Sequence, residues 1–405
     1  MSGGTRSFEQ ARRLAARGHE VHIVTSDVVG DDLAKKPKYR WRRTVEAGVN
    51  VHWFPVRYSN GMPFSRRLRA FAEFMVVASV RATRLKADLV FATSTPLTVA
   101  VPGIVASKLR RIPFVFEVRD LWPEVAIEMG ALRNPLARRL AGLLANLAYR
   151  NAEEVIVLSP GMADGVVARR PATATTIIPN AADLALFQVN QHAVRQFREG
   201  QRWLGDRPLI VYTGTLGIVN GVDYLVRAAR RLRELDADVQ FLIVGSGQEW
   251  EDVRSLAAAQ GLLDTTVRMW SSIPKSELPV LLGASTISTS MVRPIPALWD
   301  NSANKFFDAL AAGRPIAINY GGWQADLLKE SGAGLVLDPY DPDAGADSLA
   351  RGVRDKRWLL DAGRAARGLA IREFSRDLLF ERFETVLLRS ANRGLADYSA
   401  TPGLV

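Results

Sequence analysis

Residues 300–320, DNSANKFFDALAAGRPIAINY, decide how this chain is expected to fold and where it is expected to bind a ligand. Two carboxylates, Asp300 and Asp308, stand eight positions apart around a small polar stretch that runs into an apolar helix, and a Gly-Arg-Pro then ends the helix and starts a buried strand. A carboxylate just before a helix and a second one two turns into it can both face one cleft. There they would bind the hydroxyls of a sugar and a ribose, while the helix N-terminus faces a diphosphate. The alternative is an N-cap aspartate followed by a solvated helix aspartate, a pattern common in any protein.

Length and composition indicate an ordinary two-domain protein with a full core. The chain has 405 residues, of which 48% are hydrophobic and 23% charged. It contains no cysteine, so disulfides and thiolate metal sites are excluded and a cytoplasmic setting is permitted. Its four histidines show no clustering with acids in the sequence. We therefore expect no metal site and no cofactor.

The positive charge of the chain lies in its first half. Residues 1–190 contain 27 Lys and Arg against 16 Asp and Glu, whereas the 26 of each sign in residues 191–405 cancel. Two basic patches, residues 35–43 and the Arg66-Arg67-Leu68-Arg69 start of an amphipathic helix, lie beside apolar residues, which suits an anionic membrane surface. RNA binding and a plain solvated surface are the alternatives. We expect the membrane surface and no nucleic acid, with the protein on the inner face of the plasma membrane. No transmembrane helix is expected, because residues 89–107, the longest uncharged run, include two prolines and several Thr and Ser.

Strand-like apolar runs alternate with helical patterns throughout, which predicts an α/β fold with doubly wound parallel sheets. The expected strands are residues 20–25, 49–54, 88–92, 113–118, 154–158, 208–212, 239–244, 267–269, 286–289, 315–319 and 334–337. The expected helices include residues 8–17, 135–150, 191–203, 222–235, 249–260 and 376–390. We divide the chain into two doubly wound domains, residues 1–190 and 191–375, followed by a last helix and a frayed tail (376–405).

Three loops that follow predicted strands are candidate binding elements. Thr213-Gly214-Thr215 stands between a strand and a helix, where backbone amides can approach a phosphate, although glycine also serves plain turns. Val244-Gly245-Ser246-Gly247 lacks the third glycine of a dinucleotide fingerprint and is better explained as a tight turn. Residues 119–124, RDLWPE, place an Arg, two acids and a Trp at a strand end, where they could bind a sugar acceptor or form a core Trp beside an ion pair.

Together these motifs resemble retaining glycosyltransferase family 4, whose fold is GT-B with two Rossmann-like domains facing across a cleft and a C-terminal helix packing back toward the first. The nearest resemblance is to the bacterial subgroup that builds O-antigen, capsule and colanic acid, including fucosyl- and fucosaminyl-transferases. The matching segments span nearly the whole chain: Gly3-Gly4, residues 18–21 (GHEV), 118–123 (VRDLWP), 178–183 (IPNAAD) with Phe187, 212–214 (YTG), and 300–308.

The resemblance implies that residues 1–190 form the acceptor-binding domain and residues 191–375 the nucleotide-sugar-binding domain, with a crossover helix in residues 376–405. It also implies roles for individual residues. Asp300 would contact the transferred sugar and Asp308 the ribose, each one methylene shorter than the family's usual Glu. Thr215 and Asn220 stand where the family often has an Arg and a Lys that hold the diphosphate, so we expect Lys305 to take over, with Arg119 and Arg293 next in line. A salt bridge from Lys305 to Asp300 or Asp308 is the alternative. The expected catalytic residues are Asp300, Arg119 and Asp120, and the expected donor-binding residues are Gly3, Gly4, Thr213, Gly214, Thr215, Asn304, Lys305 and Asp308.

We therefore expect a retaining hexosyl-type glycosyltransferase that moves a sugar from a UDP-, GDP- or TDP-sugar to a lipid-linked saccharide acceptor. A nucleoside diphosphate sugar epimerase of the same fold and a basic RNA-binding protein are the alternatives. The resemblance also implies a central first strand in the N-terminal domain. Because Met1 stands almost directly before the Gly3-Gly4 turn, we expect that strand to be missing from this sequence.

Overall fold

A computed structural model describes residues 6–29, 40–58, 62–188 and 190–399. The chain divides into two compact units: unit 1 comprises Met1–Ile178 and Phe380–Val405, and unit 2 comprises Pro179–Leu379. The division therefore falls before the expected boundary at residue 190. The reason is that the segment after Pro179 is bound to unit 2: Asn180 donates its backbone N–H to Ser302 Oγ (3.0 Å), and Ala182 donates its own to the Phe374 carbonyl (2.8 Å).

Unit 2 is a doubly wound domain around one parallel sheet of six strands, in the order β10-β9-β8-β11-β12-β13. The strands are β8 (Leu209–Thr215), β9 (Gln240–Ser246), β10 (Val267–Trp270), β11 (Ile287–Ser290), β12 (Ile316–Ile318) and β13 (Gly334–Val336). The helices are α7 (Gln191–Gly200), η2 (Ile218–Asn220), α8 (Asp223–Glu234), α9 (Trp250–Ala259), α10 (Leu278–Ala284), η3 (Pro296–Leu298), α11 (Asn304–Ala311), α12 (Trp323–Ser331), α13 (Pro342–Arg354) and α14 (Lys356–Arg372). All six strands expected in this half are confirmed.

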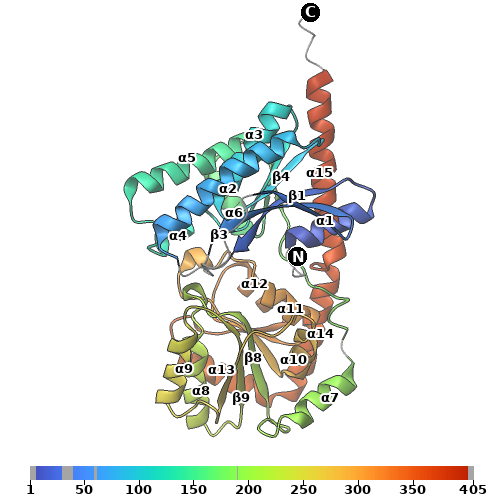
Figure 1. The fold of residues 1–405 in the computed structure, drawn as a ribbon. Coiled ribbons are helices and arrows are strands. Elements are labelled where there is room, and N and C mark those ends of the chain that lie inside the picture. The colour runs from blue at the N-terminus through green and yellow to red at the C-terminus, as the bar shows by residue number, and fades with distance from the viewer. Residues whose placement is uncertain (1–5, 30–39, 59–61, 189, 400–405) are drawn as a thin grey trace, which may run out of the picture. The chain divides into compact units, whose positions relative to one another are not determined.

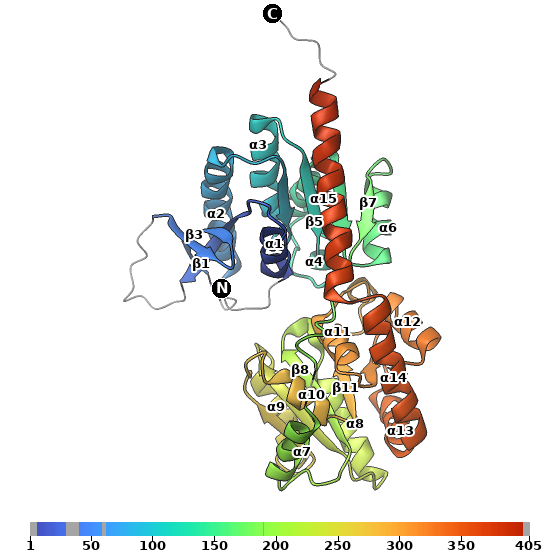
Figure 2. The same cartoon turned by 90° about the vertical axis from the view of Figure 1, so that its right-hand side faces the viewer.

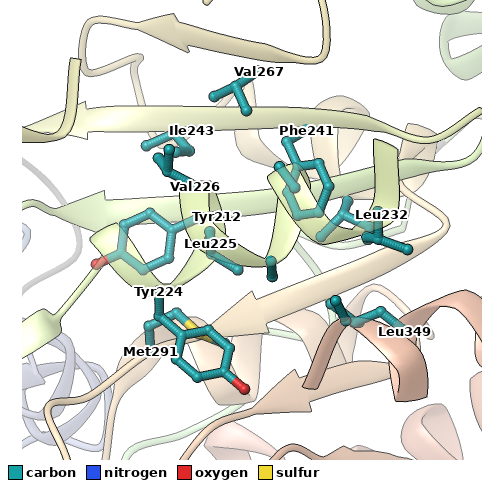
Figure 3. Close-up of a cluster of buried hydrophobic side chains, with 14 of the residues drawn as sticks. Tyr212, Tyr224, Leu225, Val226, Leu232, Phe241, Ile243, Val267, Met291 and Leu349 are labelled. Atoms are coloured by element: carbon teal, nitrogen blue, oxygen red, sulfur yellow. The ribbon is translucent and has the colours of Figure 1, made fainter. Parts of the chain in front are cut away.

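Strand β8 lies inside the hydrophobic core of unit 2. Its residues Leu209–Thr213 are buried, and α8, α9 and α13 cover one face of the sheet with apolar side chains (Figures 1 and 3). In Figure 3 the ring of Tyr212 lies in this cluster, and its hydroxyl points toward the carboxyl end of the strand. The Tyr212 hydroxyl therefore lies near the carboxyl edge of the sheet, although the ring belongs to the core.

Unit 1 contains two sheets. One has the order β1-β3-β2 and the other the order β4-β5-β6-β7. The strands are β1 (His22–Val29), β2 (Arg42–Glu46), β3 (Val49–Arg57), β4 (Val90–Thr93), β5 (Phe114–Val118), β6 (Glu154–Val157) and β7 (Thr175–Ile177). The helices are α1 (Arg6–Ala16), α2 (Phe64–Arg84), η1 (Leu97–Val99), α3 (Ala100–Arg110), α4 (Glu124–Glu128), α5 (Pro135–Asn151), α6 (Pro160–Arg169) and most of α15 (Arg376–Ser399).

The strands expected in the first half are all present, but β2 and β7 were not predicted. β2 pairs antiparallel with β3 through a two-residue turn at Ala47 and Gly48, both of which have positive φ (49° and 81°). Positive φ at both positions is the requirement of a type I′ hairpin turn. The first unit is thus mixed rather than purely parallel.

Helix α15 returns to the first unit, as expected, and is longer than expected. Figure 2 shows α15 as one long helix, which belongs to unit 1 from Phe380 onward. There the Phe383 ring packs edge-on against Phe91 of β4, and Glu384 pairs with Arg17. The helix ends at Ser399 and not near residue 390, so most of the predicted frayed tail is helical.

Helices α3 and α5 pack on the four-stranded sheet of unit 1, whereas α2 packs on β1 and β3 of the three-stranded sheet. α2 packs along α3, and α3 packs on β4, β5 and α5. Across the described residues, no helix is both long enough and apolar enough to cross a bilayer.

Candidate donor site at the carboxyl edge of unit 2

The carboxyl end of β8 and the start of α11 lie against each other. Thr213, Gly214 and Thr215 were expected in a loop after the strand, but they are its last three residues and pair with β9. Lys305, the second residue of α11, donates a hydrogen bond from Nζ to Tyr212 Oη (2.9 Å), and Tyr212 donates in turn to the Thr215 carbonyl (2.7 Å). Gly214 has a φ of 138°, and a Cβ on it would lie 3.1 Å from Lys305 Cε, so this strand end is brought together with Lys305.

Lys305 is a partly buried cation with no carboxylate partner. Burial lowers the pKa of Lys305 to about 8, and the described residues offer it no salt bridge. The expected alternative of an ion pair with Asp308 or Asp300 is therefore wrong. A cation in the first turn of a helix also opposes the helix dipole, and α11 has no acidic residue there. Both effects make an anion at this place favourable.

Asp308 lies in the second turn of α11 and is buried. The alternative interpretation of Asp308 as a solvated helix aspartate is therefore wrong. Burial raises the pKa of Asp308 to about 6, against the opposing charges of Lys275 and Arg376. Asp183 adds to the upward shift. A buried carboxylate whose pKa is raised in this way is a candidate for binding a ligand hydroxyl.

Asp300 stands in the loop between η3 and α11, three residues before the N-cap Ala303, so it is not itself the N-cap. The loop is fixed on both sides of it. The Trp299 ring packs so closely against Gly321 that a Cβ on this glycine would lie 2.8 Å from the ring. The Asn301 carbonyl accepts a hydrogen bond from Trp323 Nε1 (2.9 Å). This anchoring gives Asp300 a defined backbone position. Asn304, the first residue of α11, is exposed at the same helix end.

Residues 244–246 of the expected tight turn belong to β9, and their glycine, with Gly247 after it, is explained by close backbone approach. A Cβ on Gly245 would be 1.8 Å from the Gly214 carbonyl oxygen, and one on Gly247 would be 2.2 Å from that of Leu216. These glycines let the ends of β8 and β9 meet. Ser246 Oγ accepts a hydrogen bond from Ser272 Oγ (3.0 Å) at the same edge, a polar pair that the sequence did not indicate.

Arg293 and Asn220, the other residues of unit 2 considered for the diphosphate, are already engaged in contacts within the protein. Arg293 is engaged in a salt bridge with Glu249 and donates to the Ile218 carbonyl. Asn220 accepts from the backbone N–H of Gly217 (3.2 Å) and so closes its own turn. Lys305 is thus the better-placed cation in unit 2.

Arg119 and Asp120 lie in unit 1, directly after β5. The Arg119 backbone N–H donates to Ser94 Oγ (3.0 Å). Burial raises the pKa of Asp120 to about 6, and the charge of Arg119 opposes that shift. Their position at the carboxyl end of a strand agrees with the expectation, and their catalytic role stays a prediction. Gly3 and Gly4 lie outside the described residues.

Two of the four histidines stack on each other, a pairing that the sequence did not indicate. His22 on β1 and His52 on β3 stack, with 3.0 Å between His22 Nδ1 and His52 Nε2, and Arg81 donates to His52 Nδ1. Burial, followed by the charge of Arg81, lowers the pKa of His52 to about 4. In the part of the chain that the structure describes, no group of three His, Cys, Asp or Glu side chains could hold a metal ion.

Tyr212 is the site residue that sequence reasoning missed. It reads as an ordinary core residue of a strand, and its burial does raise its pKa far above the usual range. Its neutral hydroxyl nevertheless positions Lys305, whose ammonium also lies 4.6 Å from the centre of the Tyr212 ring. The signal in the sequence was the YTG string itself, in which the tyrosine had been given no role.

Comparisons with known proteins identify the two domains of the chain. Residues 3–181 match the glycosyl transferase 4-like domain and residues 207–355 match the glycosyl transferases group 1. The chain is 26% identical over 303 residues to a GDP-mannose-dependent alpha-(1-6)-phosphatidylinositol monomannoside mannosyltransferase of Mycolicibacterium smegmatis, with 66% of this chain and 78% of that protein covered. It is 25% identical over 270 residues to a protein of Escherichia coli (strain K12) named as a colanic acid biosynthesis glycosyl transferase, with 64% and 66% covered.

The fold has solved counterparts. A sucrose-phosphate synthase from Thermosynechococcus elongatus superposes with a TM-score of 0.73 at 18% identity, covering 96% of this chain and 93% of that one. With a glycosyl transferase 4-like domain followed by a group 1 domain, the chain is a glycosyltransferase of the GT-B fold.

Proposed function

We propose that this enzyme moves a hexose-type sugar, with retention of anomeric configuration, from a nucleoside diphosphate sugar to a lipid-linked saccharide acceptor in cell-surface polysaccharide synthesis. The observation that carries the donor half of this proposal is Lys305, which forms no salt bridge with another described residue and lies beside Gly214 at the start of α11. The names of the two relatives support the rest, because one uses GDP-mannose and a phosphatidylinositol-linked acceptor and the other is named for colanic acid.

The chemistry follows from where charge develops. When the bond from the sugar to the diphosphate breaks, negative charge grows on the leaving phosphate, and a preorganised cation stabilises it. Lys305 and the N-terminus of α11 are placed to do so. Asp300 would contact the transferred sugar and Asp308 the ribose. The proposed clamp is made of protein groups, so we propose that transfer proceeds without a metal or other cofactor, and full activity in EDTA is the expected result.

The donor assignment is tested by hydrolysis of a panel of UDP-, GDP- and TDP-sugars. The Asp300→Ala variant should lose turnover of the preferred donor while keeping nucleotide binding and the unfolding midpoint. Asp326→Ala, an exposed aspartate of α12, is the matched control and should retain activity. Normal turnover in Asp300→Ala would end the assignment of Asp300.

We also propose that unit 1 contacts an anionic membrane, and helix α5 offers the strongest support. Leu136, Leu140, Leu143 and Leu147 follow one another at helical spacing and are 47–64% exposed. Helix α5 contains no acidic residue and carries Arg138, Arg139 and Arg150. An exposed apolar stripe beside arginines suits the boundary between lipid headgroups and acyl chains, where each basic residue adds about 1 kcal/mol.

Helix α2, the element that the sequence pointed to, offers a second exposed stripe with Leu68, Val76 and Val80. Of its basic residues, Arg66 and Arg69 are exposed, whereas Arg67 lies 5.9 Å from the Tyr58 ring. The Lys35–Tyr39 part of the other basic patch lies outside the described residues.

Flotation with anionic vesicles tests the membrane contact. Replacing Leu140 and Leu143 by Gln should reduce vesicle binding strongly, and Arg66→Glu with Arg69→Glu should reduce it further and weaken its salt dependence. Leu360→Gln, an equally exposed leucine on α14 of unit 2, is the control. Activity on a soluble acceptor should survive in all of them. Unchanged vesicle binding in the α5 variant would contradict the proposal and leave the donor assignment untouched.

A further inference from the structure

Unit 2 holds a cavity of about 640 Å³ at the edge of its sheet opposite to the candidate donor site. Its wall includes Thr286 and Pro315, which immediately precede β11 and β12, whereas the donor loops follow the carboxyl ends of the strands. Helices α7 and α14 and the end of α10 supply most of the remaining wall. The volume is that of a small-molecule site.

The wall of this cavity is strongly positive. It carries four arginines, Arg198, Arg314, Arg364 and Arg367, and a single carboxylate, Asp206. Arg364 is exposed and lies 3.6 Å from Asp361. The other three are partly buried, and they form no salt bridge within the described ranges.

These three guanidinium groups donate to backbone carbonyls instead. Arg198 donates to Ala284 (2.6 Å), Gly205 and Arg207, Arg314 donates to Gly283, and Arg367 donates to Ala311. Gly283, Ala284 and Ala311 end helices α10 and α11, so capping of helix C-termini accounts for part of the arrangement.

Capping does not account for all of it. Arg198 and Arg314 donate to adjacent carbonyls at the end of α10, which brings two cations together there. Burial lowers the pKa of both arginines, and the charge of Arg198 lowers that of Arg314 further. Arg314 Nε is buried without a hydrogen-bond partner. Each guanidinium has five N–H donors, so several remain for a ligand.

We infer that this cavity is an anion site that takes a phosphate-type oxyanion, held by Arg198, Arg314 and Arg367. Guanidinium groups match the geometry of phosphate oxygens, and an anion would offset the mutual repulsion of these cations. The apolar wall residues Val194, Leu359 and Leu360 leave room for an organic part of a phosphorylated small molecule.

The test is the unfolding midpoint of the full chain in inorganic phosphate, with ionic strength held constant by chloride. At phosphate well above Kd we expect the midpoint to rise by about 2–5 °C. The Lys305→Ala variant should show the same rise, because its substitution lies at the donor site. A rise that disappears in Lys305→Ala, or no rise beyond chloride in the wild type, would overturn the inference.

Two variants locate the effect. Arg314→Gln removes a ligand, and Leu360→Glu places a carboxylate on the cavity wall at a position that is 63% exposed and therefore tolerant. Both should lose most of the phosphate effect, and Leu360→Glu decides the matter if Arg314→Gln does not fold. Arg357→Gln, on the same helix and outside the cavity wall, should behave as wild type. Full phosphate stabilisation of Leu360→Glu would contradict the site.

Discussion

The sheets of the two units differ in how well their apolar strands are covered. In unit 2, β8 lies between β9 and β11, and its first five residues are all buried. In unit 1, β4 stands at the end of one sheet and β1 at the end of the other, and every residue of β4 is only half-buried. Strand β5 of the same unit is buried along its whole length. The difference shows that an apolar sequence does not by itself bury a strand, because full burial also requires a neighbouring strand on each side.

Unpaired strand edges are a liability for stability. β1 pairs with β3 and β4 pairs with β5, and neither has a strand on its other side among the described residues. Unit 2 therefore has the continuous sheet on which a precise ligand site can rest. We expect unit 2 to be the more stable of the two and to carry donor binding.

The largest effect is expected from Gly245→Ala in unit 2. The added Cβ would be 1.8 Å from the Gly214 carbonyl oxygen, a backbone atom that cannot move without separating β8 from β9. We expect a loss of about 4 kcal/mol or more in the free energy of unfolding, measured by urea denaturation. Gly200→Ala is the control, because a Cβ there meets nothing within 4 Å. A Gly245→Ala protein as stable as the control would mean that the two strand ends do not meet as described.

Hydrogen exchange compares the units directly. Amides that donate in the β1–β3 and β4–β5 ladders should exchange on the order of 100-fold faster than those in the β8–β9 ladder, because the edge strands can open locally. Mass spectrometry of peptides from each ladder checks this. Equal protection in the three ladders would remove the contrast between the units.

A smaller effect is expected from Asp308→Asn. The pKa of Asp308 is raised to about 6 in the fold, above its usual value near 3.9, so its charged form destabilises the folded state above about pH 6 and has no effect below about pH 4. The variant should be more stable by on the order of 2 kcal/mol at pH 7.5 and equal to wild type at low pH, while nucleotide binding weakens. Asp326→Asn, at an exposed position, is the control. A stability difference that does not change with pH would contradict the assigned shift.

The sequence predicted the parts of this molecule that depend on local pattern. Apolar runs predicted eleven strands. The residues expected directly after these runs included Gly214 and Asp120, which were predicted to belong to the site. β2 was missed because its five residues, RRTVE, include a single apolar side chain and its turn is Ala-Gly without a strong hairpin signal.

The contacts that make the site lie far apart in sequence. Lys305 and Tyr212 are 93 residues apart, so their contact has no local signature. The same holds outside the site for His22 and His52, which are 30 residues apart. The burial that raises the pKa of Asp308 also depends on the packed domain. Sequence could name Lys305 and Asp308 as candidates, and the fold was needed to separate a free cation from a salt bridge and a buried carboxylate from a solvated one.

Calorimetric titration with UDP and GDP tests the central claim, that Lys305 holds the donor diphosphate. Lys305→Met should bind the nucleoside diphosphate at least about tenfold more weakly, in line with the roughly 1.5–3 kcal/mol of a hydrogen bond to a charged group. Because the pKa of Lys305 is about 8, wild-type affinity should be full near pH 7 and fall as the pH rises to 9.5, a slope that the variant should lack. Lys329→Met, an exposed lysine of α12, should bind as wild type does. Equal affinity and an equal pH profile in wild type and Lys305→Met would contradict the account.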